Sequence, residues 1–158
     1  MWMVISDTHD RLEKVQRALS YAKEAGVEWI FHCGDVVSPF VIPLFEKSGI
    51  KYIGVFGNND GDRLFLSRRS DGKFSPHPTE LEMEGKRILI MHEPVLLLAA
   101  AESGRYDFIF YGHTHELKIE ERGKTLVINP GEACGYLTER ATCVLLDPRT
   151  RKWEILEL

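Results

Sequence analysis

Five short apolar runs, each ending at polar side chains, constrain the fold of this chain more than any other feature. Residues 29–33 form the second run and lead directly into Gly34 and Asp35. Such a run is typical of a strand that is buried on both faces. In open α/β sheets, ligands bind just beyond the carboxyl ends of the strands. Asp35 is therefore the position at which we first expect chemistry.

The other four runs repeat this arrangement. Residues 4–5, 52–56, 88–91 and 108–111 are each followed closely by Asp, Asn or His side chains. The side chains delivered in this way are Asp7, His9, Asn58, Asn59, Asp60, His92, His113 and His115. A parallel or mixed sheet would gather these strand ends at one edge. The gathering predicts a metal centre.

The segments between the first three runs have helical patterns. After an N-cap expected at Asp10, apolar residues recur at helical spacing until Gly26 ends the helix. The order strand, helix, strand predicts a parallel crossover, which places the ends of the first two strands side by side. We expect a second helix over about residues 38–47. Residues 61–78 are expected to be a loop with at most one short helix around residues 64–66.

The C-terminal half is richer in strands. A hairpin over residues 81–91 would make the sheet mixed. Residues 96–101 are apolar on every side, which indicates a helix in the core or one that is covered by a second subunit, and we favour the core helix. Short strands of a second sheet are expected over residues 117–121, 125–129, 142–146 and 153–158. The sequence by itself thus predicts a single α/β domain over residues 1–158.

Composition narrows the function classes. The net charge of -4 and the pI near 5.9 argue against a nucleic-acid-coating or membrane-surface protein, because such proteins usually carry a basic face. The three cysteines contain no C-x-x-C pair, so they indicate neither a disulfide framework nor a zinc-thiolate site. The N-terminus has no signal-peptide pattern, and no apolar run approaches the roughly 20 residues that span a bilayer. We therefore expect a cytoplasmic protein with no membrane partner.

The polar side chains at the strand ends suit a particular class of ion. Their mixed oxygen and nitrogen atoms favour divalent Mn, Ni, Co, Fe or Zn over calcium. The ligand candidates are Asp7, His9, Asp35, Asn58, His92, His113 and His115. This set is too large for one tetrahedral ion. Two ions about 3.5–4 Å apart would use it fully and leave room for a bridging hydroxide, with Asp35 as the shared ligand.

The motifs resemble those of a known family. In order and rough spacing, residues 7–9, 34–35, 57–60, 92 and 112–115 resemble the five motifs of the calcineurin-like metallophosphoesterases, across nearly the whole chain. The short chain, residues 6–9 and the Asn-Pro-Gly-Glu turn at residues 129–132 resemble the small single-domain phosphodiesterases of the YfcE type. This resemblance implies a four-layer αββα sandwich of two mixed β-sheets flanked by helices.

The resemblance also implies roles for individual residues. One ion would be bound by Asp7, His9 and His115, the other by Asn58, His92 and His113, and both by Asp35. A hydroxide that bridges the ions would attack a small phosphate ester, and a diester is the expected substrate. Asn59 and Asp60 are the expected catalytic residues, and Asn59 replaces the histidine that protonates the leaving oxygen in the commoner motif. Glu93 follows His92 where close relatives often have Gly-His, so it could replace a substrate contact.

Several other polar residues have plainer interpretations. His32 is expected to be a hydrogen-bonded core residue, His77 to be exposed and idle, and Cys33 to be buried as a small apolar group. Asn129 is expected to hold the turn beneath the site. The basic residues of segment 63–73 would form either a phosphate-receiving rim or a solvated loop face.

Two other functions compete with the hydrolase. The same fold can serve as a non-catalytic protein-interaction scaffold, but a scaffold tends to lose Asp7, His9 or Asp35, and this chain keeps all three. A nuclease would be expected to have a broad basic groove, which the acidic balance disfavours. A nucleic-acid partner is therefore not expected, whereas a homodimer remains open.

Overall fold

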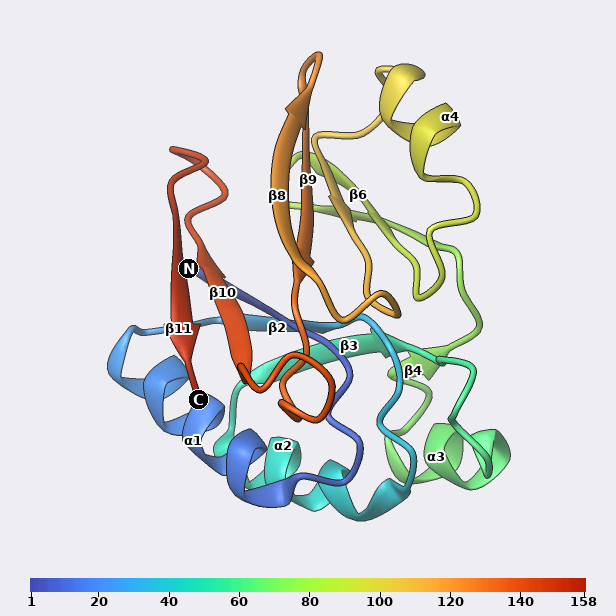
Figure 1. The fold of residues 1–158 in the computed structure, drawn as a ribbon, viewed down its shortest axis with the longest axis vertical. Coiled ribbons are helices and arrows are strands. Elements are labelled where there is room, and N and C mark those ends of the chain that lie inside the picture. Colours follow the sequence, from blue (N-terminus) through green and yellow to red (C-terminus); the bar gives the residue numbers. More distant parts are fainter.

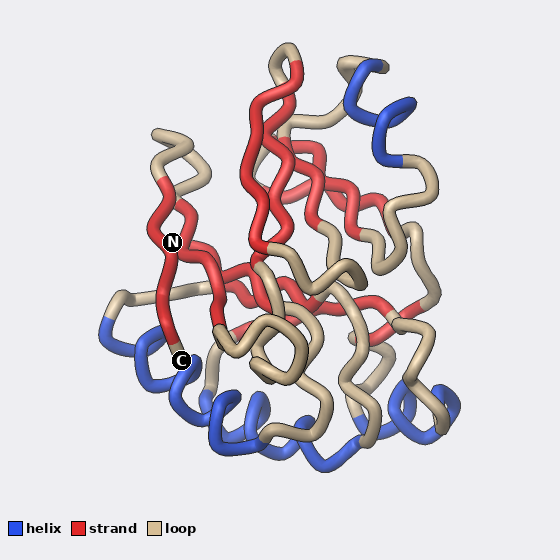
Figure 2. Tube along the Cα trace, in the orientation of Figure 1, coloured by secondary structure: helices blue, strands red, loops and turns tan.

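The structure is a computed structural model that describes all 158 residues. Two β-sheets pack face to face, and helices lie on their outer faces (Figures 1 and 2). The first sheet has the order β11-β10-β1-β2-β3-β4. Its strands are β1 (Trp2–Ile5), β2 (Trp29–His32), β3 (Lys51–Val55), β4 (Phe74–Ser75), β10 (Thr142–Leu146) and β11 (Trp153–Glu157).

The second sheet has the order β5-β6-β7-β9-β8. Its strands are β5 (Thr79–Met83), β6 (Lys86–Ile90), β7 (Phe108–Phe110), β8 (Leu117–Arg122) and β9 (Thr125–Pro130). Strands β6, β7 and β9 run parallel, and β5 and β8 pair antiparallel at the two edges. In the first sheet β1 to β4 are parallel, and β10 pairs antiparallel with both β1 and β11. Both sheets are mixed, as predicted.

The helices complete four layers. Helices α1 (Leu12–Glu24), α2 (Ile42–Ser48) and α3 (Arg63–Arg69), with the 3₁₀ turn η1 (Pro39–Val41), lie beneath the first sheet (Figures 1 and 2). Helix α4 (Leu97–Glu102) lies on the outer side of the second sheet. The predicted αββα sandwich is confirmed.

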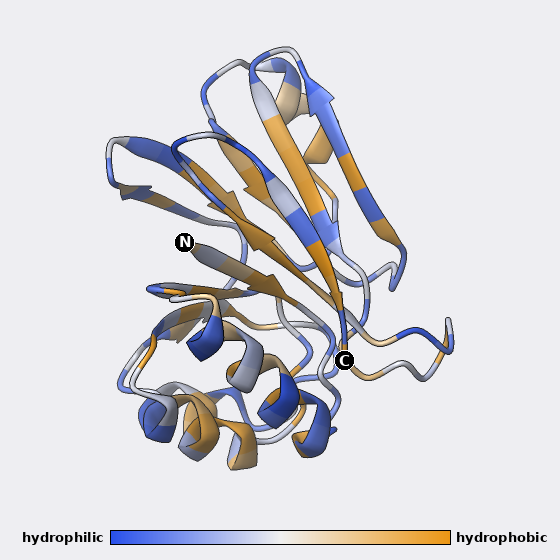
Figure 3. Cartoon of the chain, turned by 90° about the vertical axis from the view of Figure 1, so that its left-hand side faces the viewer, coloured by the Kyte–Doolittle hydropathy of each residue, from blue (hydrophilic) through white to orange (hydrophobic).

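Three apolar clusters fill the spaces between the layers. The largest joins α1 and α2 to the first sheet, the second lies between the sheets, and the smallest joins α4 to the second sheet. Trp2 links the two sheets, because its ring makes edge contacts with Phe31 of β2 and Phe108 of β7 at centroid distances of 5.1 and 5.5 Å. Figure 3 shows hydrophobic residues concentrated on the central strands.

Some predicted elements differ from the structure in detail. Helix α1 has Arg11 rather than Asp10 as its N-cap, because the Asp10 side chain instead accepts a hydrogen bond from Ser38 Oγ at 2.5 Å. The segment 61–78 is more ordered than predicted. It contains the whole of α3, which Asp62 caps through the backbone N–H of Phe65, and the short strand β4, which extends the first sheet.

The buried core helix predicted over residues 96–101 is wrong. Within α4 only Ala101 is buried, and the side chains of Leu96 and Leu98 are 49% and 56% exposed. The helix has six residues and packs one face on the second sheet, so its other faces have no neighbouring layer. No helix is long and apolar enough to cross a bilayer.

The five strands whose ends carry the candidate ligands belong to two sheets, not to one as predicted. Strands β6 and β7 belong to the second sheet, and the C-terminal pair β10–β11 belongs to the first, because β10 pairs with β1. The five strand ends therefore do not line one edge of one sheet. They meet where the carboxyl ends of both parallel sets come together, between the two sheets.

Candidate metal centre

All seven predicted ligands lie in the loops that follow the strands at this junction. They come from loops after β1, β2 and β3 of the first sheet and after β6 and β7 of the second. Hydrogen bonds donated by backbone N–H groups connect loops of the second sheet to the loop after β1. Ala133 N donates to Ser6 O at 2.9 Å, and His113 N donates to Asp7 Oδ2 at 3.1 Å. The structure thus brings together the residues that the sequence selected.

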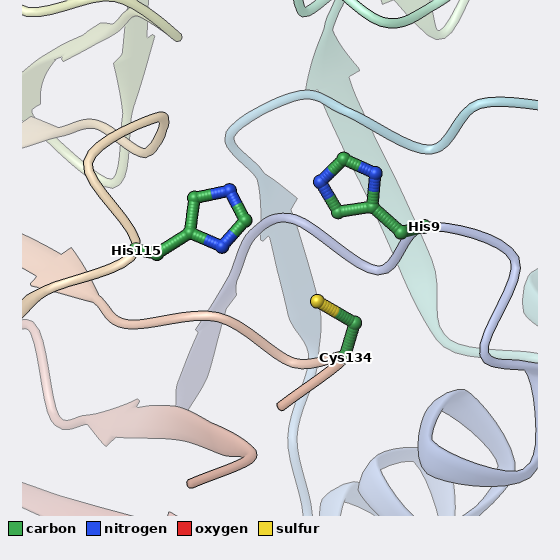
Figure 4. Close-up of side chains that lie close together, drawn as sticks. All are labelled: His9, His115 and Cys134. Atoms are coloured by element: carbon green, nitrogen blue, oxygen red, sulfur yellow. The ribbon is translucent and has the colours of Figure 1, made fainter. Parts of the chain in front are cut away.

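The first group of candidate ligands lies around the buried carboxylate of Asp7, in the loop after β1. Asp7 Oδ1 lies 3.4 Å from His115 Nε2 and 3.9 Å from His9 Nε2. His9 Nε2 lies 3.5 Å from Asp35 Oδ2. His9 and His115 point toward each other from separate loops, with their rings stacked at 5.4 Å (Figure 4).

The second group lies on the other side of Asp35. Asn58 Oδ1 is 2.8 Å from both His92 Nε2 and His113 Nδ1. His92 Nε2 is also 3.5 Å from Asp35 Oδ2. Because a backbone carbonyl can only accept, the 2.8 Å contact of His92 Nδ1 with Cys33 O fixes the ring hydrogen on Nδ1. Nε2 is therefore the ring nitrogen of His92 that faces Asn58 and Asp35 in the site.

Two buried atoms test whether a cation fits here. Asp7 Oδ1 and His9 Nε2 are buried and have no hydrogen-bond partner, which is costly for a polar atom. The carboxylate–imidazole separations of 3.4–3.9 Å in the first group are too long for good hydrogen bonds. They match the spacing of ligands that each lie about 2.0–2.2 Å from a common ion. The residues therefore fit a divalent metal.

The backbone of the ligands is unusual. Asp7, His9, Asp35, His113 and His115 all have positive φ, between 39° and 69°. Non-glycine residues rarely adopt this conformation, and strained backbone of this kind clusters at functional sites. Five of the seven ligand candidates share it, which supports a common functional constraint on these loops.

Two glycines allow the loops to approach closely. A Cβ added to Gly57 would lie 2.1 Å from Asp35 Oδ1, and one added to Gly112 would lie 2.0 Å from Ser6 Oγ and 2.8 Å from Asp7 Oδ2. Both contacts are far below van der Waals distance. Only glycine can therefore bring these two loops against the carboxylates of the site.

The charges of the site depend on burial and on mutual contacts. Burial raises the pKa of Asp7. Burial also favours a raised pKa at Asp35, but the nearby His92 and the hydrogen bonds from Asn59 hold the pKa of Asp35 well below its usual range. Burial lowers the pKa of His92, yet the Asp35 carboxylate outweighs this effect and raises it. The centre therefore keeps an ionised carboxylate at its middle.

The residues predicted as catalytic occupy different positions. Asn59 is exposed, and its Nδ2 and backbone N–H donate to the two oxygens of Asp35 at 2.7 and 2.8 Å. Asp60 is buried and accepts hydrogen bonds from the backbone N–H groups of Gly57, Val37 and Asp35. The catalytic role of Asp60 stays a prediction, and its geometry indicates that it holds the loops together.

Other expected roles can be compared with the structure. His32 is buried between Thr8 Oγ1 and Gly34 N, and burial lowers its pKa to about 3, so the predicted core role is confirmed. Cys33 is buried, as predicted. Asn129 Nδ2 donates to Thr114 Oγ1 at 2.9 Å, so it does hold the turn beneath the site.

The basic residues of segment 63–73 are largely paired within the protein. Arg63 donates to Gly57 O and Asp60 O, and Arg69 pairs with Glu46 at 3.7 Å. Arg63 therefore stabilises the loop that carries Asn58. The Glu93 side chain has no hydrogen-bond or ion-pair partner within the protein, so its role as a substrate contact stays a prediction.

Sequence reasoning missed two residues at the site. His77 is half-buried rather than exposed, its Nδ1 has no partner, and its ring lies 6.2 Å from that of His92. Glu132 is fully buried, and its Oε2 lies 2.7 Å from His115 Nδ1. Burial favours a raised pKa for Glu132, but hydrogen bonds, led by those from Cys134 and Thr138, lower it to about 2. The turn at residues 129–132 was the only sequence signal for Glu132.

Comparison with known proteins agrees with this geometry. The sequence model of one protein family, the calcineurin-like phosphoesterase superfamily domain, matches residues 1–151. Phosphodiesterase MJ0936 of Methanocaldococcus jannaschii is 38% identical over 161 residues, which cover 98% of this chain and 97% of that protein. Phosphodiesterase YfcE of Escherichia coli K12 is 26% identical over 148 residues, which cover 82% of this chain and 77% of that protein.

A solved structure gives the same result. The structure of a novel archaeal phosphodiesterase matches this fold with a TM-score of 0.93 at 37% identity, and the match covers 99% of both chains. The family resemblance of the five motifs is thereby confirmed. The chain belongs to the calcineurin-like phosphoesterase superfamily.

Proposed function

We propose that this protein is a binuclear metal-dependent phosphodiesterase. One observation carries the proposal: Asp35 Oδ2 lies 3.5 Å from both His9 Nε2 and His92 Nε2, so one carboxylate oxygen faces both ligand groups. One ion would be held by Asp7, His9, His115 and Asp35. The other would be held by Asp35, Asn58, His92 and His113.

The ions would be divalent Mn, Ni, Co, Fe or Zn. They would supply a deprotonated bridging water as the nucleophile and neutralise the negative charge of the phosphoryl oxygens. The side chains of this chain orient that chemistry. Asp7, Asp35 and His92 are buried, whereas Asn58, Asn59 and His113 are exposed. A small phosphate ester therefore reaches the centre from the side of the exposed residues.

Asn59 sets a limit on the reaction. Its side-chain amide and its backbone N–H each donate one hydrogen bond to Asp35 at the open side of the site. The side-chain amide can donate a hydrogen bond but not a proton. A leaving group that departs without protonation therefore suits this site. Two relatives are named phosphodiesterases, and this supports a diester as the substrate. A cytoplasmic location and a homodimer stay predictions.

The test combines metal analysis with hydrolysis of bis(p-nitrophenyl) phosphate across Mn, Ni, Co, Zn and Mg. We expect two ions per chain and metal-dependent release of p-nitrophenol. Asp35→Asn should abolish turnover and reduce bound metal while the protein stays folded. An Asp35→Asn protein with two ions and normal turnover would contradict the binuclear proposal. A folded wild type that binds no divalent metal would favour the scaffold instead.

A further inference from the structure

Glu132 lies behind the first ligand group and is the fully buried carboxylate of the loop that follows β9. Its Oε2 contacts His115 Nδ1 at 2.7 Å, Cys134 Sγ at 3.0 Å and Tyr136 N at 3.1 Å. Its Oε1 contacts the backbone N–H groups of Leu137, at 2.8 Å, and Thr138. The direct link from this carboxylate to the ligand set is thus His115.

The partners of Glu132 determine how it bonds. Backbone N–H groups can only donate, and they contact both oxygens: Tyr136 N at Oε2, and the amides of Leu137 and Thr138 at Oε1. These donors on both oxygens stabilise the ionised carboxylate, in which each oxygen can only accept hydrogen bonds. Since Oε2 only accepts, the short contact with His115 requires His115 Nδ1 to carry the ring hydrogen. The Nε2 lone pair of His115 is then free on the side of Asp7 Oδ1, 3.4 Å away.

The same carboxylate also fixes a second part of the first group. By holding the N–H groups of residues 136–138, it places the Tyr136 ring 6.5 Å from the His9 ring. The Arg11 guanidinium lies 5.0 Å from the centre of the Tyr136 ring. Figure 4 shows His9, His115 and Cys134 pointing toward one another from three segments. Glu132 therefore supports two imidazoles of one ion site and none of the other.

We propose that Glu132 is the positioning residue of the first ion site, where it fixes the ring hydrogen of His115 and holds Tyr136 beside His9. This inference rests on the proposed binuclear function. Hydrogen-bond partners of metal-ligating histidines typically change metal affinity by about 10–100-fold when they are removed. The loss should fall on the ion bound by Asp7, His9 and His115, and the ion bound by Asn58, His92 and His113 should keep its affinity.

The experiment compares wild type with Glu132→Gln, which has the same shape. In either orientation the new NH₂ group faces at least one obligate backbone donor, so the hydrogen-bond set cannot be kept. Mn²⁺ titration by calorimetry should resolve two binding steps in wild type. In Glu132→Gln one step should weaken by about 10–100-fold and the other should be unchanged. If both Mn²⁺ binding steps weakened together in Glu132→Gln, or if neither step weakened, the proposal would be wrong.

A second measurement needs no metal and no activity. The ¹⁵N imidazole spectrum of the metal-free wild type should show His115 as the Nδ1–H form, and Glu132→Gln should shift it toward the Nε2–H form. If wild-type His115 carries its hydrogen on Nε2, the proposal is wrong even if Glu132→Gln fails to fold.

Thr138→Val is the matched control. It removes a hydroxyl that lies 2.8 Å from Glu132 Oε1, on the side away from His115. Both Mn²⁺ affinities and the His115 spectrum should stay as in wild type. An equal loss of the first ion in Thr138→Val would assign the effect to the loop and overturn a specific role of Glu132. If wild type itself binds fewer than two ions, the proposed function fails, and this outcome differs from two intact ions in Glu132→Gln.

Discussion

Gly57→Ala places one methyl group directly against the central carboxylate. The added Cβ would lie 2.1 Å from Asp35 Oδ1 and 2.4 Å from Asp35 N. Comfortable contacts between non-bonded heavy atoms are about 3.5–4.0 Å. The loop at Gly57 and the loop at Asp35 must therefore separate by roughly 1 Å or more, because one of the two clashing atoms belongs to the backbone.

This separation has two consequences of known size. Overpacking of this kind costs about 1–3 kcal/mol of stability. For a chain of this length that corresponds to a Tm lowered by about 2–12 °C. The shift also strains the 2.8 Å bond from Asn59 N to Asp35 Oδ1 and moves the carboxylate away from His9 and His92. A misplacement of about 1 Å can cost about 10²-fold in rate, so we expect a loss of that order.

Gly61→Ala is the matched control, because no atom lies within 4 Å of its added Cβ and its φ is not positive. Thermal melts, bound metal and hydrolysis of bis(p-nitrophenyl) phosphate should be measured for both variants. Gly61→Ala should behave as wild type in all three. A Gly57→Ala protein with two ions, normal turnover and unchanged Tm would refute the claim that loop proximity fixes Asp35.

Three further predictions follow from the same geometry. Asn59→His should raise rates on alkyl diesters relative to aryl diesters, because an acid at this place contributes about 10²–10⁴-fold with poor leaving groups; equal leaving-group slopes in both fully metallated proteins would exclude this role. His9→Ala and His92→Ala should each bind about one ion per chain at limiting metal, and a variant with wild-type stoichiometry would remove that residue from the ligand set. His32 has a pKa of about 3 in the fold against 6.5 for its ordinary value, so the unfolded chain binds the proton first as pH falls. As the pH falls below this ordinary pKa, the free energy of unfolding should thus decrease by up to about 1.4 kcal/mol per pH unit. Free energies of unfolding measured by urea titration at several pH values should depend less steeply on pH in His32→Asn.

The candidate ligands could be selected from the sequence because they follow local signals. A strand that is buried on both faces is largely apolar, so the polar residues that follow it mark the end of the strand. Asp7, Asp35 and His92 are all found this way and are all buried in the structure. The short strands of the C-terminal half and the second helix also follow local sequence signals.

Features that depend on distant partners could not be read in this way. The sequence of the apolar run before His92 does not reveal which sheet it joins, and in the structure it pairs with β5 and β7 of the second sheet. Residues 96–101 look like a core helix because composition does not reveal how many layers surround a segment. Glu132 is an ordinary acidic residue in sequence, and only the approach of His115 from another loop gives it a partner.

Backbone hydrogen bonds between the loops help to hold the candidate metal centre in place. Residues in sparsely populated backbone regions cost about 1–3 kcal/mol each, and five ligands are in this state. Backbone hydrogen bonds between the loops oppose this cost: Asp7 N to Gly34 O at 3.0 Å, His9 N to Asp35 O at 3.1 Å and Cys134 N to Asp7 O at 3.1 Å. Because these bonds use no ligand atom, they orient the site before any ion binds. The side-chain atoms left unpaired, Asp7 Oδ1 and His9 Nε2, are then the ones a cation would satisfy.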